Sequence, residues 1–183
     1  MALHFERKEY AQRIRKTIAA MEKEGLDGLL MFHQESMYYL TGYDTFGFCF
    51  FQCLYLGTDG TLALLTRSPD LRQAQKTSII KDIRIWTDEA GAKPANQLKD
   101  MLKSLGPKGR RLGFESNSYG LTHANGVAVT STLKGFCKLV DASDLVNEIR
   151  LIKSPAELDY VRKAGKLADA ALKAAIAETH AGA

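Results

Sequence analysis

Short apolar runs alternate with segments of helical periodicity from the start of the chain to residue 149. The apolar runs fall at residues 26–32, 46–57, 61–66, 83–86, 110–114 and 137–140, and helical segments fit residues 7–24, 35–40, 69–77, 94–105, 119–132 and 143–149. This alternation is typical of α/β proteins, in which helices cover a sheet. The sequence therefore predicts a mixed β-sheet flanked by helices on both faces.

The strongest turn signal lies between two of the apolar runs. Residues 46–57 (FGFCFFQCLYLG) lead into GTDG, residues 57–60, and TLALLT follows. An Asp-Gly pair between apolar runs predicts an antiparallel hairpin. Because both faces of the first run are apolar, we expect this hairpin in the middle of the sheet. Cys49 and Cys53 would then be thiols on one face of a strand.

The clearest helix start lies near the end of the sequence. Ser154 suits the N-cap, Pro155 suits the first helical position, and Glu157 completes a capping box. Apolar residues then recur at steps of three and four as far as Ile176, which gives the helix an apolar stripe. Either this helix packs on its own domain, or it opens a second domain. The boundary candidate, residues 148–154, divides the chain into 1–147 and 148–183.

Composition and spacing argue against several classes of function. Lys and Arg total 25 against 21 Asp and Glu, and the two signs are interleaved, so no charged block favours nucleic acid. No apolar run approaches the roughly 20 residues of a membrane span, and no signal peptide is evident, so a cytoplasmic location is expected. The three cysteines and four histidines lack the spacings of metal sites. The sequence contains no self-contained catalytic motif.

Three segments carry a resemblance to a known family. They are LDGLLMFHQESMYYLTGY (26–43), RLGFES (111–116) and LVDASDLVNEIRLIKSPAELDYVRKAG (139–165). In order and spacing they resemble the creatinase, prolidase and aminopeptidase P family across essentially the whole chain. The resemblance implies an N-terminal domain with a ribonuclease H-like mixed sheet, followed by a "pita-bread" catalytic domain. It also implies that the helix after Ser154 is the first helix of that catalytic domain and that the chain is truncated there.

The chemistry of this family belongs to the catalytic domain. There an Asp, Asp, His, Glu, Glu set holds two divalent metal ions, Mn, Co or Zn, which activate a water and polarise the scissile carbonyl. None of these positions has a match in this chain. The resemblance thus implies no cofactor and no hydrolysis in the chain itself, whereas the parent protein would be a metal-dependent hydrolase of the Xaa-Pro dipeptidase or aminopeptidase type.

The resemblance also implies a role for the loop after the YLTGY turn. The resemblance implies a homodimer in which the N-terminal domain of one subunit helps to close the substrate pocket of the partner subunit. Tyr43, Asp44, Phe46 and Phe48 are therefore candidate substrate-binding residues, and His33, which follows a buried strand, is a fifth. Each has a structural alternative, such as core or hairpin packing for the aromatic residues and helix capping for His33.

The substrate remains open at this point. The arginine that contacts substrate in creatinase-like members falls near Phe50 here, which argues against a creatine-like substrate held by that arginine. The loop YDTFGFCFFQ, residues 43–52, somewhat resembles ectoine hydrolases. The parent could therefore act on Xaa-Pro peptides or on a small amide such as the ring of ectoine. A histone chaperone of the same architecture has lost its metals, so a non-enzymatic peptide-binding module is the other class.

Overall fold

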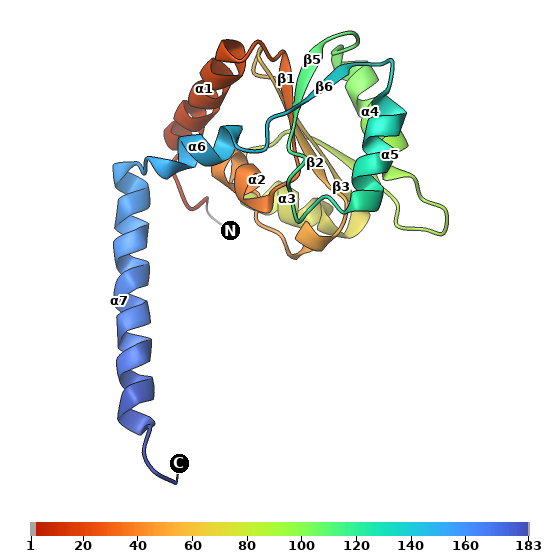
Figure 1. Ribbon diagram of the computed structural model, residues 1–183. Coiled ribbons are helices and arrows are strands. Elements are labelled where there is room, and N and C mark those ends of the chain that lie inside the picture. The colour runs from red at the N-terminus through yellow and green to blue at the C-terminus, as the bar shows by residue number, and fades with distance from the viewer. Residues whose placement is uncertain (1–2, 183) are drawn as a thin grey trace. The chain divides into compact units, whose positions relative to one another are not determined.

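A mixed sheet of six strands forms the centre of the first part of the chain. The strands are β1 (Gly28–Met31), β2 (Cys53–Gly57), β3 (Leu62–Arg67), β4 (Asp82–Trp86), β5 (Arg111–Phe114) and β6 (Lys138–Asp141). Their order in the sheet is β4-β3-β2-β1-β5-β6 (Figure 1). The β1–β2 and β2–β3 pairs are antiparallel, and the β3–β4, β1–β5 and β5–β6 pairs are parallel. The predicted central hairpin is therefore confirmed as β2 and β3.

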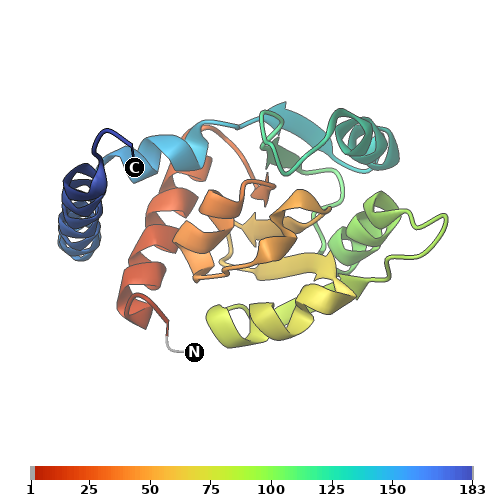
Figure 2. The same cartoon turned by 90° about the horizontal axis from the view of Figure 1, so that it is seen from below.

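Helices cover both faces of this sheet, as the sequence predicts. They are α1 (Arg7–Lys23), α2 (Gln34–Thr41), α3 (Leu71–Thr77), α4 (Pro94–Leu105), α5 (His123–Leu133) and α6 (Leu145–Leu151). Helices α4 and α5 pack on one face, and α1, α2, α3 and α6 pack on the other (Figures 1 and 2). Side chains alternate along β1 accordingly: Leu30 belongs to the core under α4 and α5, whereas Leu29 and Met31 belong to the opposite core.

The computed structural model describes residues 3–182, which fall into two compact units. The first unit ends at Ile149, and the second begins at Arg150 and contains helix α7 (Pro155–Glu178). The predicted capping box is present, with the Ser154 hydroxyl accepting from the Glu157 N–H at 3.2 Å and the Ser154 N–H donating to the Glu157 carboxylate at 2.7 Å. In the described chain, α7 buries none of its side chains. No described helix is both long and apolar enough to cross a membrane.

The apolar run at residues 46–57 is not one long strand, so that expectation is wrong in its first half. Phe46–Cys49 forms a short 3-10 helix, η1, and β2 begins only at Cys53. The Thr45 hydroxyl accepts from the Gly47 N–H at 2.8 Å and turns the backbone away from the sheet. Cys49 is therefore exposed while Cys53 is fully buried, and the two thiols do not share a strand face.

The turn before α5 also departs from the sequence pattern, which placed the helix start near residue 119. Helix α5 begins at His123, because the Thr122 hydroxyl caps it by accepting from the Asn125 N–H at 3.3 Å. Gly120 lies in the preceding turn, where an added Cβ would stand 2.3 Å from the carbonyl oxygen of Phe32. The turn therefore requires glycine because the backbone after β1 approaches it closely.

Two glycine substitutions test this close approach. Gly120→Ala is expected to lower the free energy of unfolding by about 1–3 kcal/mol, because the new methyl group must displace backbone. Gly126→Ala is the matched control, since its Cβ would meet only Leu121 at 3.8 Å and alanine favours the helix by up to about 1 kcal/mol. Urea denaturation followed by circular dichroism measures both. Equal stability of the two variants would show that the turn can relax.

Candidate functional site

One edge of the sheet brings together segments that are distant in the sequence. Strands β1, β5 and β6 are parallel, so their carboxyl ends lie at the same edge. Strand β2 is antiparallel to β1 and begins at that edge, and β3 returns to it together with β4. The start of α2, the loop before β2, the start of α3 and the turn after β5 therefore meet there. Ligand sites of α/β proteins commonly lie at such an edge.

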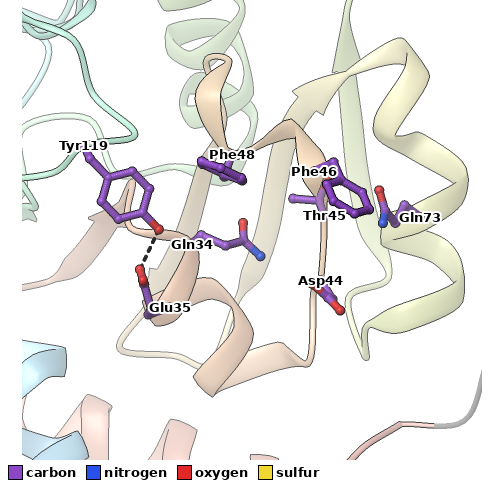
Figure 3. A pocket seen from close by; sticks show the side chains of 8 residues that line it. All are labelled: Gln34, Glu35, Asp44, Thr45, Phe46, Phe48, Gln73 and Tyr119. Atoms are coloured by element: carbon purple, nitrogen blue, oxygen red, sulfur yellow. Dashed lines mark hydrogen bonds between the residues drawn. The ribbon is translucent and has the colours of Figure 1, made fainter. Parts of the chain in front are cut away.

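A pocket of about 430 Å³ lies among these segments (Figure 3). Its walls are formed by Gln34, Glu35, Asp44, Thr45, Phe46, Phe48, Gln73 and Tyr119. Three of the five predicted site residues, Asp44, Phe46 and Phe48, line it. Phe46 is 87% exposed and Phe48 is 42% exposed, so the loop presents apolar rings to the outside instead of burying them in the core.

Tyr43, a fourth predicted residue, lies behind the pocket and does not line it. Its side chain is fully buried, and its hydroxyl forms a hydrogen bond of 3.1 Å with the Thr66 hydroxyl. Burial raises the pKa of the Tyr43 phenol. Its carbonyl oxygen accepts from the Gln34 side-chain amide at 2.7 Å. In this chain Tyr43 therefore supports a wall residue through its backbone.

His33, the fifth predicted residue, occupies the N-cap position of α2 but contributes no side-chain cap. Its ring packs edge-on against Tyr119, with the ring centroids 5.5 Å apart. Tyr119 also packs against the Phe48 ring at 5.9 Å and donates its hydroxyl to the Glu35 carboxylate at 2.7 Å. His33 thus lies next to the pocket, in contact with one of its walls. Whether any of the five residues touches a substrate stays a prediction.

Glu115, which the sequence reasoning did not single out, joins the end of β5 to the start of α2. This fully buried carboxylate accepts from the N–H groups of Phe32 and His33, at 2.8 and 2.9 Å, and from the Ser36 hydroxyl at 2.6 Å. Burial raises the pKa of Glu115, and the three hydrogen bonds oppose that rise. The only signal for it was its place in the RLGFES segment, since no local pattern marks a buried acid.

A second buried carboxylate, Asp70, holds the loop that carries the exposed rings. It accepts from the Thr45 hydroxyl at 3.3 Å and from the Arg67 guanidinium at 3.1 Å. The Arg67 guanidinium in turn lies 3.3 Å from the centre of the Phe50 ring, a cation–π contact. A Cβ at Gly47 would stand 2.5 Å from the Asp70 carboxylate, so a larger residue there would displace that carboxylate. Asp70 therefore sets the course of the loop.

Phe50 and Phe51 separate in the structure, since one side chain is buried and the other is partly exposed. Phe51 is buried, and its carbonyl oxygen accepts from the Trp86 indole at 2.9 Å. Phe50 is 42% exposed and covers Arg67. Phe51 therefore belongs to the core, whereas Phe50 stays at the surface in contact with Arg67.

The carboxylates of this region do not gather into a metal-binding set. Within residues 3–182, no three His, Cys, Asp or Glu side chains lie close enough together to hold a metal ion. Glu35 and Asp44 are the acidic side chains of the pocket wall. These residues do not fit the five-ligand set that the resemblance assigns to the catalytic domain.

The family match covers most of the chain. Residues 13–152 match the Creatinase/Prolidase N-terminal domain. The chain belongs to this family. It is 32% identical over 176 residues to the ectoine hydrolase of Halomonas elongata, covering 91% of this chain and 43% of that protein. It is 30% identical over 181 residues to an uncharacterized hydrolase/peptidase of Sinorhizobium fredii, covering 95% of this chain and 46% of that protein. The chain thus spans less than half the length of these relatives.

Solved structures share the fold. The Xaa-Pro dipeptidase from Bacillus anthracis has a TM-score of 0.76 at 21% identity, covering 95% of this chain and 45% of that one. The prolidase from Thermococcus sibiricus has a TM-score of 0.79 at 21% identity, with 94% and 45% covered. The N-terminal domain of the cytoplasmic peptidase PepQ from Mycobacterium tuberculosis, with a TM-score of 0.59 and 24% identity, is covered over 97% of its length and covers 75% of this chain. This chain therefore has the fold of the N-terminal domain of such hydrolases.

Replacing Glu115 by Gln is expected to change how stability depends on pH. Because burial raises the pKa of Glu115 in the folded protein, its stabilising effect is complete below the unfolded pKa of about 4.3 and is lost as pH rises through the folded value. The free energy of unfolding of the native chain, relative to that of Glu115→Gln, should therefore fall as pH rises through this window. Urea denaturation at a series of pH values measures it.

The control for this experiment is Glu22→Gln, which removes an exposed carboxylate from α1. Its stability should follow that of the native chain across the same pH range. A difference between native and Glu115→Gln chains that does not change with pH would contradict the raised pKa of Glu115.

A pair of aspartate variants tests the support of the loop. Asp70 and Asp88 both contact Arg67, but Asp70 alone also holds Thr45 and packs on Gly47. Asp70→Asn weakens charge-assisted hydrogen bonds of about 1.5–3 kcal/mol, so amide exchange at Gly47 and its neighbours should accelerate by about tenfold or more. Asp88→Asn should leave those amides nearly unchanged. Similar rates of amide exchange in both variants would contradict the conclusion that Asp70 holds the loop in place.

Proposed function

We propose that this chain is the non-catalytic N-terminal domain of a metal-dependent hydrolase of the Xaa-Pro peptidase type. The observation that carries the proposal is the pocket walled by Asp44, Phe46 and Phe48, in a chain of the Creatinase/Prolidase N-terminal domain family. Its exposed rings offer apolar surface that a substrate or a second domain can cover, and such surface commonly marks a binding site.

In the proposed arrangement, the parent protein is a homodimer and the loop of one subunit closes the substrate pocket of the partner subunit. Phe46 and Phe48 would exclude water from the bound substrate, and Asp44 would interact with its polar end. The two divalent metal ions, Mn, Co or Zn, would be held by a catalytic domain outside the residues described. The contribution of this chain would then be to select the substrate and to exclude water.

A hydrolase of small cyclic amides is the second candidate. The 32% identity to an ectoine hydrolase over 91% of this chain favours it. Phe50, near the position where creatinase-like members carry an arginine, argues against a creatine-like substrate held by that arginine. The two candidates share the same domain and pocket and differ in the group that enters it.

The decisive experiment uses the longest protein that the gene encodes. With added Mn²⁺, Co²⁺ or Zn²⁺, it should hydrolyse Xaa-Pro dipeptides or ectoine. Phe48→Ala should lower kcat/KM by about tenfold or more, since it removes apolar contact worth at least about 1.4 kcal/mol, while metal content stays unchanged. Ile85→Ala is the matched control, because Ile85 is 44% exposed but lies outside the pocket wall.

Two results would overturn the proposal in different ways. Absence of hydrolysis of both substrate classes by the longer protein would favour the non-enzymatic binding module. Hydrolysis with the same kcat/KM in Phe48→Ala and Ile85→Ala would show that the loop does not take part in the substrate pocket.

A further inference from the structure

Lysine side chains that are scattered in the sequence meet around a second pocket, of about 380 Å³, which we call the lysine pocket. The second half of α4, the turn before β5 and the turn between α5 and β6 form it. Its lining residues are Lys99, Lys103, Lys108, Lys134, Gly135 and Phe136. Because both turns precede parallel strands, the lysine pocket lies at the opposite edge of the sheet from the pocket of Figure 3.

Two hydrogen bonds hold the walls of the lysine pocket together. The Lys99 ammonium group donates to the carbonyl oxygen of Thr132 at 2.7 Å, which joins α4 to α5. The Gly109 N–H donates to the carbonyl oxygen of Phe136 at 2.7 Å, which joins the two turns. Helices α4 and α5 lie side by side on one face of the sheet (Figures 1 and 2). The fold therefore keeps the lysines close to one another.

The positive charge of the chain is concentrated around this pocket. Residues 94–111 and 123–138, which contain its walls, carry seven Lys and Arg and a single acid, Asp100. Since Lys and Arg total 25 against 21 Asp and Glu in the whole chain, the residues outside these two segments carry 18 basic and 20 acidic side chains. Like charges around one hollow repel one another, and an anion bound there relieves the repulsion.

The four ammonium groups keep most of their hydrogen-bond donors for a ligand. Lys103 pairs with Asp100 at 2.8 Å, and Lys99 gives one donor to the carbonyl oxygen on α5. An ammonium group has three donors, so two remain on each of these lysines. Lys108 and Lys134 are exposed and form no ion pair with a described residue. Because no acidic side chain lines the pocket, its wall offers a ligand mainly donors and positive charge.

The type of basic residue and the size of the pocket indicate the class of anion. Lysine binds phosphate groups as a flexible point charge, without the flat two-point geometry with which arginine holds a single carboxylate. A hollow of about 380 Å³ suits a small ligand, whereas a nucleic-acid strand needs an extended groove. Four lysines around it match an anion that carries several negative charges.

We infer that the lysine pocket binds a small multivalent anion with neighbouring phosphate groups, that is, a polyphosphate or a phosphorylated small molecule. Lys99 and Lys103 from α4, together with Lys108 and Lys134 from the two turns, balance its charge. The inference goes beyond the proposed function and does not depend on it, because the lysine pocket shares no residue with the pocket of Figure 3.

Titration of the chain with three inorganic anions tests the inference. In calorimetry at constant ionic strength, triphosphate should bind about tenfold or more tightly than sulfate, with pyrophosphate between them, because attraction grows with the charge of the anion. In NMR spectra of the isotope-labelled chain, the largest amide shifts should come from Lys108, Gly109, Lys134 and Gly135. Equal affinities for triphosphate and sulfate, or no binding of triphosphate, would overturn the inference and leave the lysines to interact with the carboxyl ends of α4 and α5.

Variants of exposed lysines identify the groups that produce the affinity. Lys108→Gln and Lys134→Gln should each weaken triphosphate binding by about threefold to tenfold, whereas Lys134→Arg keeps the charge and should stay within about twofold. Lys16→Gln is the matched control, because it makes the same change of charge at an exposed position of α1, on the opposite face of the sheet. Equal losses of affinity in all three glutamine variants would indicate a general charge effect and would contradict a site at the lysine pocket.

Further titrations separate the possible sources of the phosphate groups. Free triphosphate represents a soluble ligand, and vesicles with a phosphorylated inositol lipid represent a membrane headgroup. Binding of either one that weakens in Lys134→Gln but not in Lys16→Gln supports the inference and identifies the source. A short DNA duplex that binds more tightly than triphosphate would overturn the inference, because an extended phosphate backbone would then be the preferred ligand.

Discussion

The hydrogen bonds of Glu115 are the contact on which the candidate site depends. Its buried carboxylate ties the end of β5 to the start of α2, which lies 79 to 83 residues earlier in the sequence, through two backbone N–H groups and the Ser36 hydroxyl. Gln34 and Glu35 follow directly, and Tyr119 lies a few residues after Glu115. The bonds therefore fix both sides of the pocket relative to each other. A carboxylate without its donors would be too costly to keep in this position.

The sequence predicted the architecture because burial patterns are local. Apolar runs and helical periodicity placed the hairpin of β2 and β3 in the middle of the sheet and placed helices on both faces. The prediction of a strand was wrong for residues 46–52, because contacts with a residue distant in the sequence determine the backbone conformation there. Asp70 reaches Thr45 and packs on Gly47, and these contacts hold Phe46–Cys49 in a 3-10 helix. No periodicity within the run could reveal a carboxylate more than 20 residues away.

The site was predictable only in part for the same reason. The family resemblance pointed to the loop, and Asp44, Phe46 and Phe48 do line the pocket. The remaining wall comes from α2, α3 and the turn after β5, which meet only because the parallel and antiparallel strands end at one edge. Tyr43 shows that a residue next to a pocket residue in the sequence need not line the pocket. It precedes Asp44 yet lies in the core, and only its carbonyl oxygen contacts the wall residue Gln34.

The site combines a rigid support with an uncovered surface. Behind the loop, Asp70 and Arg67 hold the backbone, so the exposed rings are presented without a large ordering cost when something covers them. Helix α7, considered by itself, likewise has a fixed start at its capping box and leaves apolar side chains such as Leu158, Leu172 and Ile176 exposed. A large exposed apolar surface promotes association, so such a surface commonly marks a place where a partner binds. Under the proposed function, a catalytic domain and a substrate would cover these two surfaces.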